Sequence, residues 1–379
     1  MDFNNILENL KAEGNLRTLP NETPEGFIDF TSNDYLGLAS DPALAREFLE
    51  SLSEFRFSTS SSRLLASCQE SFIRLESYLE SIYGRPVLLF NSGYHANTGI
   101  ISSVASEGKC LVIADKLVHA SIIDGIILSR ADFRRFSHND MDGLRKILEA
   151  NKDKYDSFLV ISESVFSMDG DDAPLDELLQ IKKEFPGVIL YLDEAHALGV
   201  RGPEGKGRAQ ESGSPAEWDI IVAPMGKAAA SMGAFAVCSK ELKDFLVNRS
   251  RSLIFSTALP PIQMQWSLFI LKKMFEAEER RKHLKKLSLR LSNILREIFN
   301  QQNPTYSHIQ PLIIGDSRKA VKMSERIYES GIKVLPIRKP TVPKGTERLR
   351  FSLTADMSEE DIDKLGTVLA EIKCRGDIL

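Results

Sequence analysis

A series of short apolar runs, separated by stretches with helical periodicity, constrains the fold of this chain most strongly. The runs lie at residues 87–90, 111–114, 158–161, 188–192, 220–223 and 234–237. Nearly continuous apolar runs are typical of strands that are buried on both faces, as in parallel sheets. Helical stretches between most of them supply the crossovers that parallel strands need. The pattern predicts an α/β fold with a mostly parallel sheet that is covered on both faces.

The texture of the sequence changes after residue 262. A long, heavily charged amphipathic helix is predicted for about 263–300, with strands at 308–314, 332–337 and 349–353 and helices at 317–330 and 358–373. Ser358, with Asp361 three residues later, predicts a capped start of the last helix. Since 379 residues exceed one simple core, we expect an N-terminal helix and arm over 1–40, a large α/β domain over 41–262 and a small α+β domain over 263–379.

The composition excludes several classes of protein. A formal charge of −5 gives no basic excess for nucleic acid, and the basic cluster at 280–286 is interpreted as the solvated face of a helix. No run approaches the roughly 20 apolar residues that cross a bilayer, and the N-terminus lacks the features of a signal peptide. Four separated cysteines without a CxxC pair argue against disulfides and metal. We expect a cytoplasmic protein with no nucleic acid, membrane or metal partner.

Asp193 and Lys227 carry the strongest chemical signal. Each follows an apolar run, and parallel strands place their carboxyl ends at one edge, where open α/β sheets bind ligands. Asp193 is costly to desolvate unless it is paired, and His196 follows it at the same edge. The small residues around Lys227 favour a desolvated amine. A lysine that forms a Schiff base and an aspartate that holds a pyridinium nitrogen are what pyridoxal phosphate (PLP) requires, although an ordinary loop lysine is the alternative.

Three further strand ends carry candidate residues with simpler explanations beside them. The turn of residues 91–94, with Gly93 and Tyr94, could bring backbone N–H groups to a phosphate, although Tyr94 could equally cover the sheet. His119 could stack on a flat ring or carry a proton, but a lone histidine is more often a cap or a core residue. Ser167 could donate to a cofactor oxygen, and a serine in a turn needs no such role.

The letters Asp-Glu-Ala-His at 193–196 also occur in nucleotide-driven motors, which require a phosphate-binding loop. The nearest candidate, residues 202–207, has the wrong spacing, follows the acidic motif, and lacks a serine or threonine after its lysine. It is better interpreted as a glycine-rich surface turn. The motor hypothesis therefore fails.

Taken together and in order, the motifs resemble the α-oxoamine synthases, which are fold-type I PLP enzymes that join an amino acid to an acyl thioester with loss of CO2. The resemblance covers about residues 30–365, and residues 337–350 are most similar to the biotin-pathway branch. The matching motifs are Asn33-Asp-Tyr-Leu-Gly-Leu38, Ser92-Gly-Tyr-x-Ala-Asn97, His119-Ala-Ser-Ile-x-Asp-Gly125, Phe136-x-His-Asn-Asp140, Val165-Phe-Ser-Met-Asp-Gly-Asp171, Asp193-Glu-Ala-His-x-Leu-Gly-Val200 and Gly226-Lys-Ala228.

The resemblance implies a homodimeric acyltransferase that condenses L-alanine with an acyl-CoA or acyl-carrier-protein thioester. In it, Lys227 links to the cofactor and moves the α-proton, Asp193 holds the pyridinium and His119 stacks on the ring. Ser167 and His196 contact the phenolic oxygen of the cofactor. The remaining implied roles are Gly93 and Tyr94 beside the cofactor, Thr257 at the phosphate across a dimer interface, Arg350 at the amino-acid carboxylate, and Arg17 and Thr341 at substrate.

Two positions depart from the family pattern. Pro224 stands where the family usually has a threonine beside the phosphate, and it has neither hydroxyl nor N–H. Serines fill the stretch 58–62, which is usually rich in glycine. Three alternatives stay open from the sequence: a family member that uses glycine, one that uses serine, or a homologue without catalytic activity.

Overall fold

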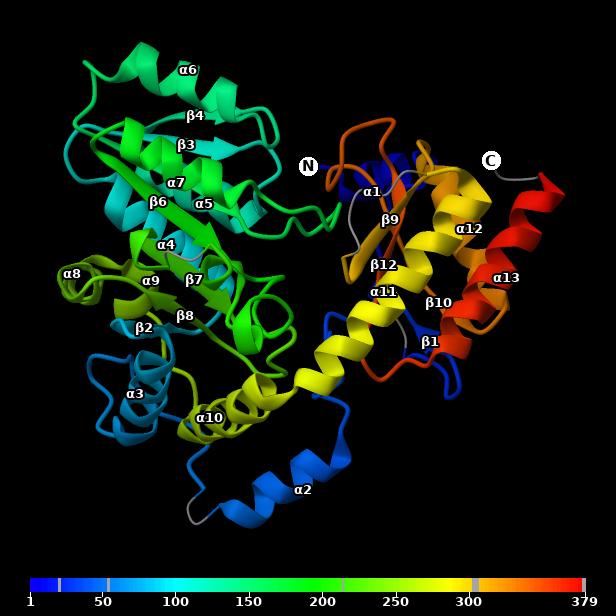
Figure 1. Ribbon diagram of the computed structural model, residues 1–379, viewed down its shortest axis with the longest axis horizontal. Helices are drawn as coiled ribbons and strands as arrows, with labels where there is room; N and C mark the ends of the chain where they lie inside the picture. Colours follow the sequence, from blue (N-terminus) through cyan, green and yellow to red (C-terminus); the bar gives the residue numbers. More distant parts are fainter. Residues whose placement is uncertain (20–21, 53–54, 213–214, 302–306, 377–379) are drawn as a thin grey trace. The chain divides into compact units, whose positions relative to one another are not determined.

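The computed structural model describes residues 1–19, 22–52, 55–212, 215–301 and 307–376 (Figure 1). Contacts along the chain divide it into two compact units. Unit 1 comprises residues 1–36, 167–171 and 279–379, and unit 2 comprises residues 37–166 and 172–278. The three-part division predicted from the sequence is finer, and these units do not test it.

A seven-stranded sheet forms the centre of unit 2, in the order β2-β8-β7-β6-β5-β3-β4. Only β8, among the strands of this sheet, runs antiparallel to its neighbours β2 and β7. The sheet is therefore mostly parallel, as the sequence predicts. The strands are β2 (Val87–Phe90), β3 (Cys110–Asp115), β4 (Asp132–Phe136), β5 (Ser157–Glu163), β6 (Val188–Asp193), β7 (Ile220–Pro224) and β8 (Ala234–Val237).

Helices cover both faces of this sheet, with α4 and α5 on one side and α7 on the other (Figure 1). Alternate strand residues, among them Leu159, Ile161, Tyr191 and Val222, pack with α4 and α5 in a buried core. The helices of unit 2 are α2 (Pro42–Ser51), α3 (Glu70–Tyr83), α4 (Gly93–Ala105), α5 (Ala120–Ser129), α6 (Met141–Asn151), α7 (Leu175–Glu184), α8 (Lys240–Arg249), α9 (Arg251–Ile254) and α10 (Pro261–Glu276), with short 3-10 turns at Pro203–Gly205, Arg208–Gln210 and Pro215–Glu217.

All six predicted strands of the large sheet are present, and β4 is the strand that the sequence did not reveal. It lies at the sheet edge beside β3, and four of its five residues are exposed. An edge strand that meets water lacks the apolar run of a buried strand, so β4 carries polar residues such as Arg134 and Arg135.

Unit 1 contains two small sheets. One pairs β1 with β10 in parallel, and the other has the antiparallel order β11-β12-β9. Ser358 and Asp361 form a capping box at the start of α13, as predicted. The elements are α1 (Phe3–Ala12), β1 (Ile28–Asp29), α11 (Glu278–Phe299), β9 (Ile309–Ile313), α12 (Ser317–Glu329), β10 (Ile332–Lys333), β11 (Leu335–Ile337), β12 (Arg348–Ser352) and α13 (Glu359–Arg375).

The single long helix predicted for 263–300 is wrong. The chain forms α10 and α11 instead, with Ala277 between them at ψ 46°, outside the helical range. Amphipathic periodicity continues through such a break, so the pattern alone does not reveal it. Within the described part of the chain, no helix has the length and apolar content to span a bilayer.

Candidate active site

The carboxyl ends of β5 and β6 place Glu163 and Asp193 side by side. The two residues are direct partners in the parallel register, so their side chains leave the sheet on the same face. This is the face covered by α4 and α5, because Ile161 and Tyr191 precede them by two residues and belong to that core. Glu163 is 2% exposed and Asp193 is 3% exposed.

Asp193 is held by two nitrogen donors. Asn97 of α4 donates from Nδ2 to Asp193 Oδ2 at 2.8 Å, and the backbone N–H of Ala195 donates to Oδ1 at 2.9 Å. Asn97 is itself fixed, because it donates to Ser121 Oγ at 2.9 Å and accepts from the hydroxyl of Tyr191 at 2.5 Å. The carboxylate is thus oriented by a buried network that reaches three elements.

His119 occupies the N-cap position of α5. Its Nδ1 lies 2.7 Å from Ser121 Oγ, and its backbone N–H donates to Glu163 Oε1 at 2.5 Å. Burial lowers the pKa of His119 below its ordinary value; the nearby positive charge of Lys227 acts in the same direction, and Asp193 opposes both. Near neutral pH the ring is therefore an uncharged, flat imidazole, as stacking on an aromatic cofactor requires.

Lys227 lies in the loop that joins β7 to β8. The loop is closed by hydrogen bonds from Met225 N to Gly233 O at 2.9 Å and from Ala230 N to Lys227 O at 2.8 Å. Lys227 Nζ lies 3.0 Å from Nε2 of the buried His196. The structure therefore brings together the amine and the imidazole that the sequence selected independently.

Gly93 begins α4 where the chain approaches Pro224. A Cβ atom on Gly93 would lie 2.6 Å from Pro224 Cγ, so no larger residue fits without movement. Ser92 caps the helix and accepts from His95 N at 3.2 Å. Tyr94 donates its hydroxyl to Asp124 and is half exposed. The first-turn N–H groups of a helix have no intrahelical acceptor, which suits them to an anion such as phosphate.

Pro224 ends β7 at a point where its missing N–H is not needed. The backbone N–H of Glu194 donates to Val222 O at 2.7 Å, and a continued ladder would bring an N–H at position 224 to Glu194 O. That carbonyl instead accepts from the N–H groups of Ala197 at 3.0 Å and Leu198 at 2.9 Å. A proline is therefore tolerated at this strand end.

Thr257 is exposed, and contacts to its backbone hold it in place. Asn91 Nδ2 donates to Thr257 O at 2.6 Å, and Thr257 forms an isolated antiparallel bridge with Ser62. Thr59 of the same serine-rich stretch donates to Ala258 O at 3.0 Å. The stretch 58–62 thus serves to hold the segment that carries Thr257.

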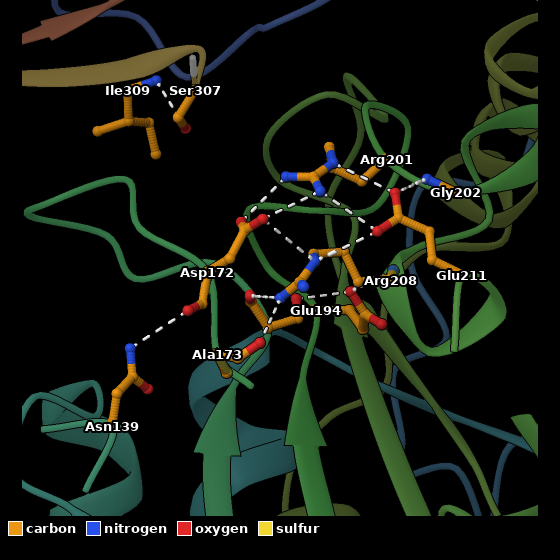
Figure 2. Close-up of polar contacts among 11 residues, drawn as sticks. Asn139, Asp172, Ala173, Glu194, Arg201, Gly202, Arg208, Glu211, Ser307 and Ile309 are labelled. Carbon is orange, nitrogen blue, oxygen red and sulfur yellow. Dashed lines mark hydrogen bonds and ion pairs between the residues drawn. The ribbon is translucent and has the colours of Figure 1, made fainter. Parts of the chain in front are cut away.

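Glu194, the residue after Asp193, belongs to a polar network with Arg208 (Figure 2). It accepts from Ser164 Oγ at 2.6 Å and from the N–H groups of Arg208 at 3.1 Å and Ala209 at 2.7 Å. Burial raises its pKa, and these donors oppose that rise. Figure 2 shows Asp172 between two guanidinium groups, with a bidentate pair to Arg201 at 3.0 Å. This network fixes the loop after β6 and hence the segment that carries His196.

The predicted residues of unit 1 form two local pairs. Arg350 Nε donates to the carbonyl oxygen of Ser167 at 2.6 Å, and its NH1 and NH2 groups donate to Asn33 Oδ1 at 3.3 and 3.2 Å. Arg17 NH2 donates to Thr341 Oγ1 at 2.8 Å. Unit 1 therefore carries Ser167, Arg350, Arg17 and Thr341, and unit 2 carries the other predicted residues.

The residues of unit 2 fit the chemistry of PLP. Asp193 is buried, oriented and able to accept from a protonated ring nitrogen, while His119 is an uncharged ring beside it. Lys227 is the amine for the covalent link. Gly93 lies too close to Pro224 for a side chain, so the start of α4 presents backbone N–H groups, which can bind an anion such as phosphate.

Comparison with known proteins agrees with this fit. A family model described as aminotransferase class I and II matches residues 25–369. A protein of Pasteurella multocida named "Putative 8-amino-7-oxononanoate synthase" is 43% identical over 378 residues, which cover 97% of both chains. The fold and the site define a fold-type I PLP-dependent enzyme.

Solved structures extend the likeness. A serine palmitoyltransferase of Sphingomonas wittichii superimposes with a TM-score of 0.87 at 32% identity, covering 93% of this chain and 89% of that one. A high-resolution structure of SPT with a PLP internal aldimine has a TM-score of 0.85 at 30% identity and the same coverage. An 8-amino-7-oxononanoate synthase of Francisella tularensis has a TM-score of 0.74 at 28% identity, covering 93% and 100%. The chain belongs to the class I and II aminotransferase family and, within it, to the α-oxoamine synthases.

Glu163, Asn97, Ser121 and Tyr191 are parts of this site that the sequence did not single out. Asn97 and Ser121 lie within quoted motifs, but helical residues give no sign of which strand they face. Glu163 follows the apolar run 158–161 after one serine, whereas Asp193 follows its run directly, so the signal for Glu163 is weaker.

Proposed function

We propose that this enzyme condenses L-alanine with a pimeloyl thioester, carried by CoA or an acyl-carrier protein. The products are 8-amino-7-oxononanoate, the free thiol and CO2, as a step of biotin biosynthesis. The observation that carries the catalytic part is the pairing of Lys227 Nζ with His196 at 3.0 Å in the same unit as the oriented Asp193. The name of a relative at 43% identity supports alanine as the amino acid.

The reaction exchanges bonds in a defined order. A carbon–carbon bond forms between the alanine Cα and the thioester carbonyl carbon, the carbon–sulfur bond breaks, and the thiol leaves. The bond to the alanine carboxylate then breaks, CO2 leaves, and a proton takes its place on that carbon. PLP, when bound, supplies the electron sink for the charge that develops on the amino acid.

The residues of this chain supply the remaining functions. Lys227 provides the amine for the covalent link and moves the α-proton through Nζ, and His196 lies within hydrogen-bond reach of that atom. Asp193, oriented by Asn97, holds a protonated ring nitrogen. In this proposal Arg350 binds the amino-acid carboxylate, and Arg17 and Thr341 contact substrate. Ser167 donates to the phenolic oxygen, and Thr257 contacts the phosphate of a second subunit's cofactor.

The likeness to serine palmitoyltransferases, at a TM-score of 0.87, favours serine as the second candidate amino acid. Glycine is a third. A homologue without activity is disfavoured, because Lys227, Asp193, His119 and His196 are all retained and the first two stand in ordered networks. We also propose a homodimer in the cytoplasm. The free thiols of Cys68, Cys110, Cys238 and Cys374 support a reducing compartment.

Thiol release from pimeloyl-CoA tests the proposal. Purified enzyme loaded with PLP is given alanine, serine, glycine or no amino acid. We expect release to depend on alanine, with a product of the mass of 8-amino-7-oxononanoate. Release with serine alone would instead assign the serine-using branch. No release with any of the three, from either the CoA or the acyl-carrier-protein thioester, would remove the catalytic proposal.

A further inference from the structure

Four buried carboxylates lie at the carboxyl ends of β3, β5 and β6. Three of them are well supplied with donors. Asp193 and Glu194 accept the hydrogen bonds described above, and Asp115 accepts from the N–H groups of Leu117 at 2.7 Å and Asn139 at 2.8 Å. Asp115 also faces His138 Nδ1 at 3.0 Å. Glu163 is the fourth, and within the described part of the chain it accepts one hydrogen bond, from the N–H of His119.

Glu163 and Asp193 cannot both be anions at low cost. They are register partners on adjacent strands, and both are almost fully buried. Two like charges in one desolvated site force a proton onto one of them. Asp193 has the larger set of donors, so the proton belongs on Glu163.

The surrounding charges agree with this assignment. Burial is the largest cause that raises the pKa of Glu163 well above its ordinary value, followed by Asp193 and, more weakly, Asp115. Lys227 and the N–H of His119 act in the opposite direction. These groups come from β3, β6, the start of α5 and the β7–β8 loop.

We propose that Glu163 is a positioning residue of the active site, which as a neutral carboxylic acid holds the backbone of His119 and leaves the negative charge on Asp193. Since two anions side by side in this desolvated site are costly, a neutral Glu163 leaves Asp193 as the single carboxylate that the ring nitrogen needs. An apolar residue would not serve, because it would leave the N–H of His119 without its acceptor. The inference rests on the proposed function only for the roles of Asp193 and His119.

The first test is the pH dependence of thermal unfolding in full-length, cofactor-free protein. A raised pKa means that native Glu163 keeps a proton that the unfolded chain releases above its own lower pKa. The stability due to this proton is complete below the unfolded pKa and is lost as the pH rises toward the folded one. Glu163→Gln has no proton to release and keeps a carbonyl oxygen for His119. We expect its Tm to gain about 2–4 °C relative to the wild type between pH 5 and pH 8.

Glu163→Ala is the matched variant that removes the acceptor as well. We expect its Tm to lie below that of Glu163→Gln at each pH. In titrations of the visible absorption with PLP, the Kd of Glu163→Gln should stay within about threefold of the wild type, and that of Glu163→Ala should rise about tenfold or more. A Tm difference between Glu163→Gln and wild type that is flat or falls with pH would overturn the proposal, as would equal loss of PLP binding in both variants.

These outcomes are separable from the proposed function. The unfolding measurements involve neither cofactor nor substrate, so they can fail while thiol release with alanine is observed. They can equally succeed if the enzyme prefers serine.

Discussion

The side chains around Asp193 form a hydrogen-bond network that orients its buried carboxylate. Asn97 links it to Ser121 and to the hydroxyl of Tyr191, so one strand, β6, and two helices, α4 and α5, meet at a single amide. If a buried carboxylate loses such a donor, the free energy of removing it from water is no longer offset by that hydrogen bond. The network therefore determines how well the cofactor nitrogen can be held.

Asn97→Ala is expected to weaken PLP binding by about 1–3 kcal/mol, because Asp193 loses its donor at 2.8 Å. The Kd from fluorescence or absorbance titration measures this loss. Ser121→Ala is the comparison variant, since it removes the acceptor of Asn97 and the partner of His119 Nδ1 but leaves the bond from Asn97 to Asp193, so its loss of affinity should be smaller. Equal affinities for the Asn97→Ala variant and the wild type would contradict the assigned role of the network.

His119 gives a pH-dependent prediction at the same scale. Its folded pKa lies below the ordinary value of 6.5, so the unfolded chain takes up a proton first as the pH falls. Stability due to the neutral ring is therefore present above the unfolded pKa and is lost toward the lower folded pKa. The Tm of the wild type should fall relative to His119→Phe between pH 7 and pH 5. A difference that does not vary with pH would contradict a buried neutral His119.

At the scale of elements, the end of β7 is where the sequence predicts a departure from the usual family pattern. Pro224 faces Gly93 at the start of α4, and the neighbouring carbonyl of Glu194 is already satisfied by two N–H groups. The proline is thus accommodated structurally, but it offers no donor to an anion at that helix start.

Pro224→Thr is expected to tighten PLP binding by about 1.5–3 kcal/mol, because its hydroxyl adds a charge-assisted hydrogen bond to the phosphate. Pro224→Val has nearly the same shape as threonine and no hydroxyl, so it controls for the loss of the proline ring. Titration of the cofactor-free protein measures both. Equal Kd values for the threonine and valine variants would show that position 224 does not reach the phosphate.

The helices and strands also show which parts of the fold and site could be predicted from the sequence. Apolar runs such as 188–192 predicted the buried strands correctly. Asp193 was selected because it directly follows such a run, and its neighbour Glu163 was missed because a serine separates it from the run before it. The edge strand β4 escaped because its exposed side chains carry no such run. Asn97 and Ser121 escaped because their role depends on which strand ends face their helices, and periodicity does not contain that information.

For the whole molecule, exposed apolar side chains of unit 2 support the proposed homodimer. Phe55 and Phe57 stack with ring centroids 6.4 Å apart, and Leu64 and Leu65 are exposed on the same segment. The segment 55–65 contains the serine stretch 58–62, in which Ser62 forms the bridge to Thr257. Exposed apolar side chains on one segment are typical of a surface that contacts another chain, which supports the proposed homodimer.

Light scattering should give a mass of about twice 42.4 kDa. The double variant Phe57→Asp and Leu65→Asp should halve that mass and weaken PLP binding, because Thr257 would no longer meet the cofactor of a second subunit. Phe133→Ser, which changes an exposed side chain of β4, is the control that should remain dimeric. A wild type of 42.4 kDa would contradict the dimer.

The central claim is a decarboxylative condensation that begins with alanine. Its most direct test follows CO2 from carboxyl-labelled L-alanine together with the free thiol from pimeloyl-CoA, using Lys227→Ala as the inactive reference. We predict that wild-type enzyme releases one CO2 for each thiol and that neither forms without the other. The Lys227→Ala variant should be slower by a factor of about 10² to 10⁴ or more. Thiol release without labelled CO2, or release by Lys227→Ala at the wild-type rate, would contradict the account.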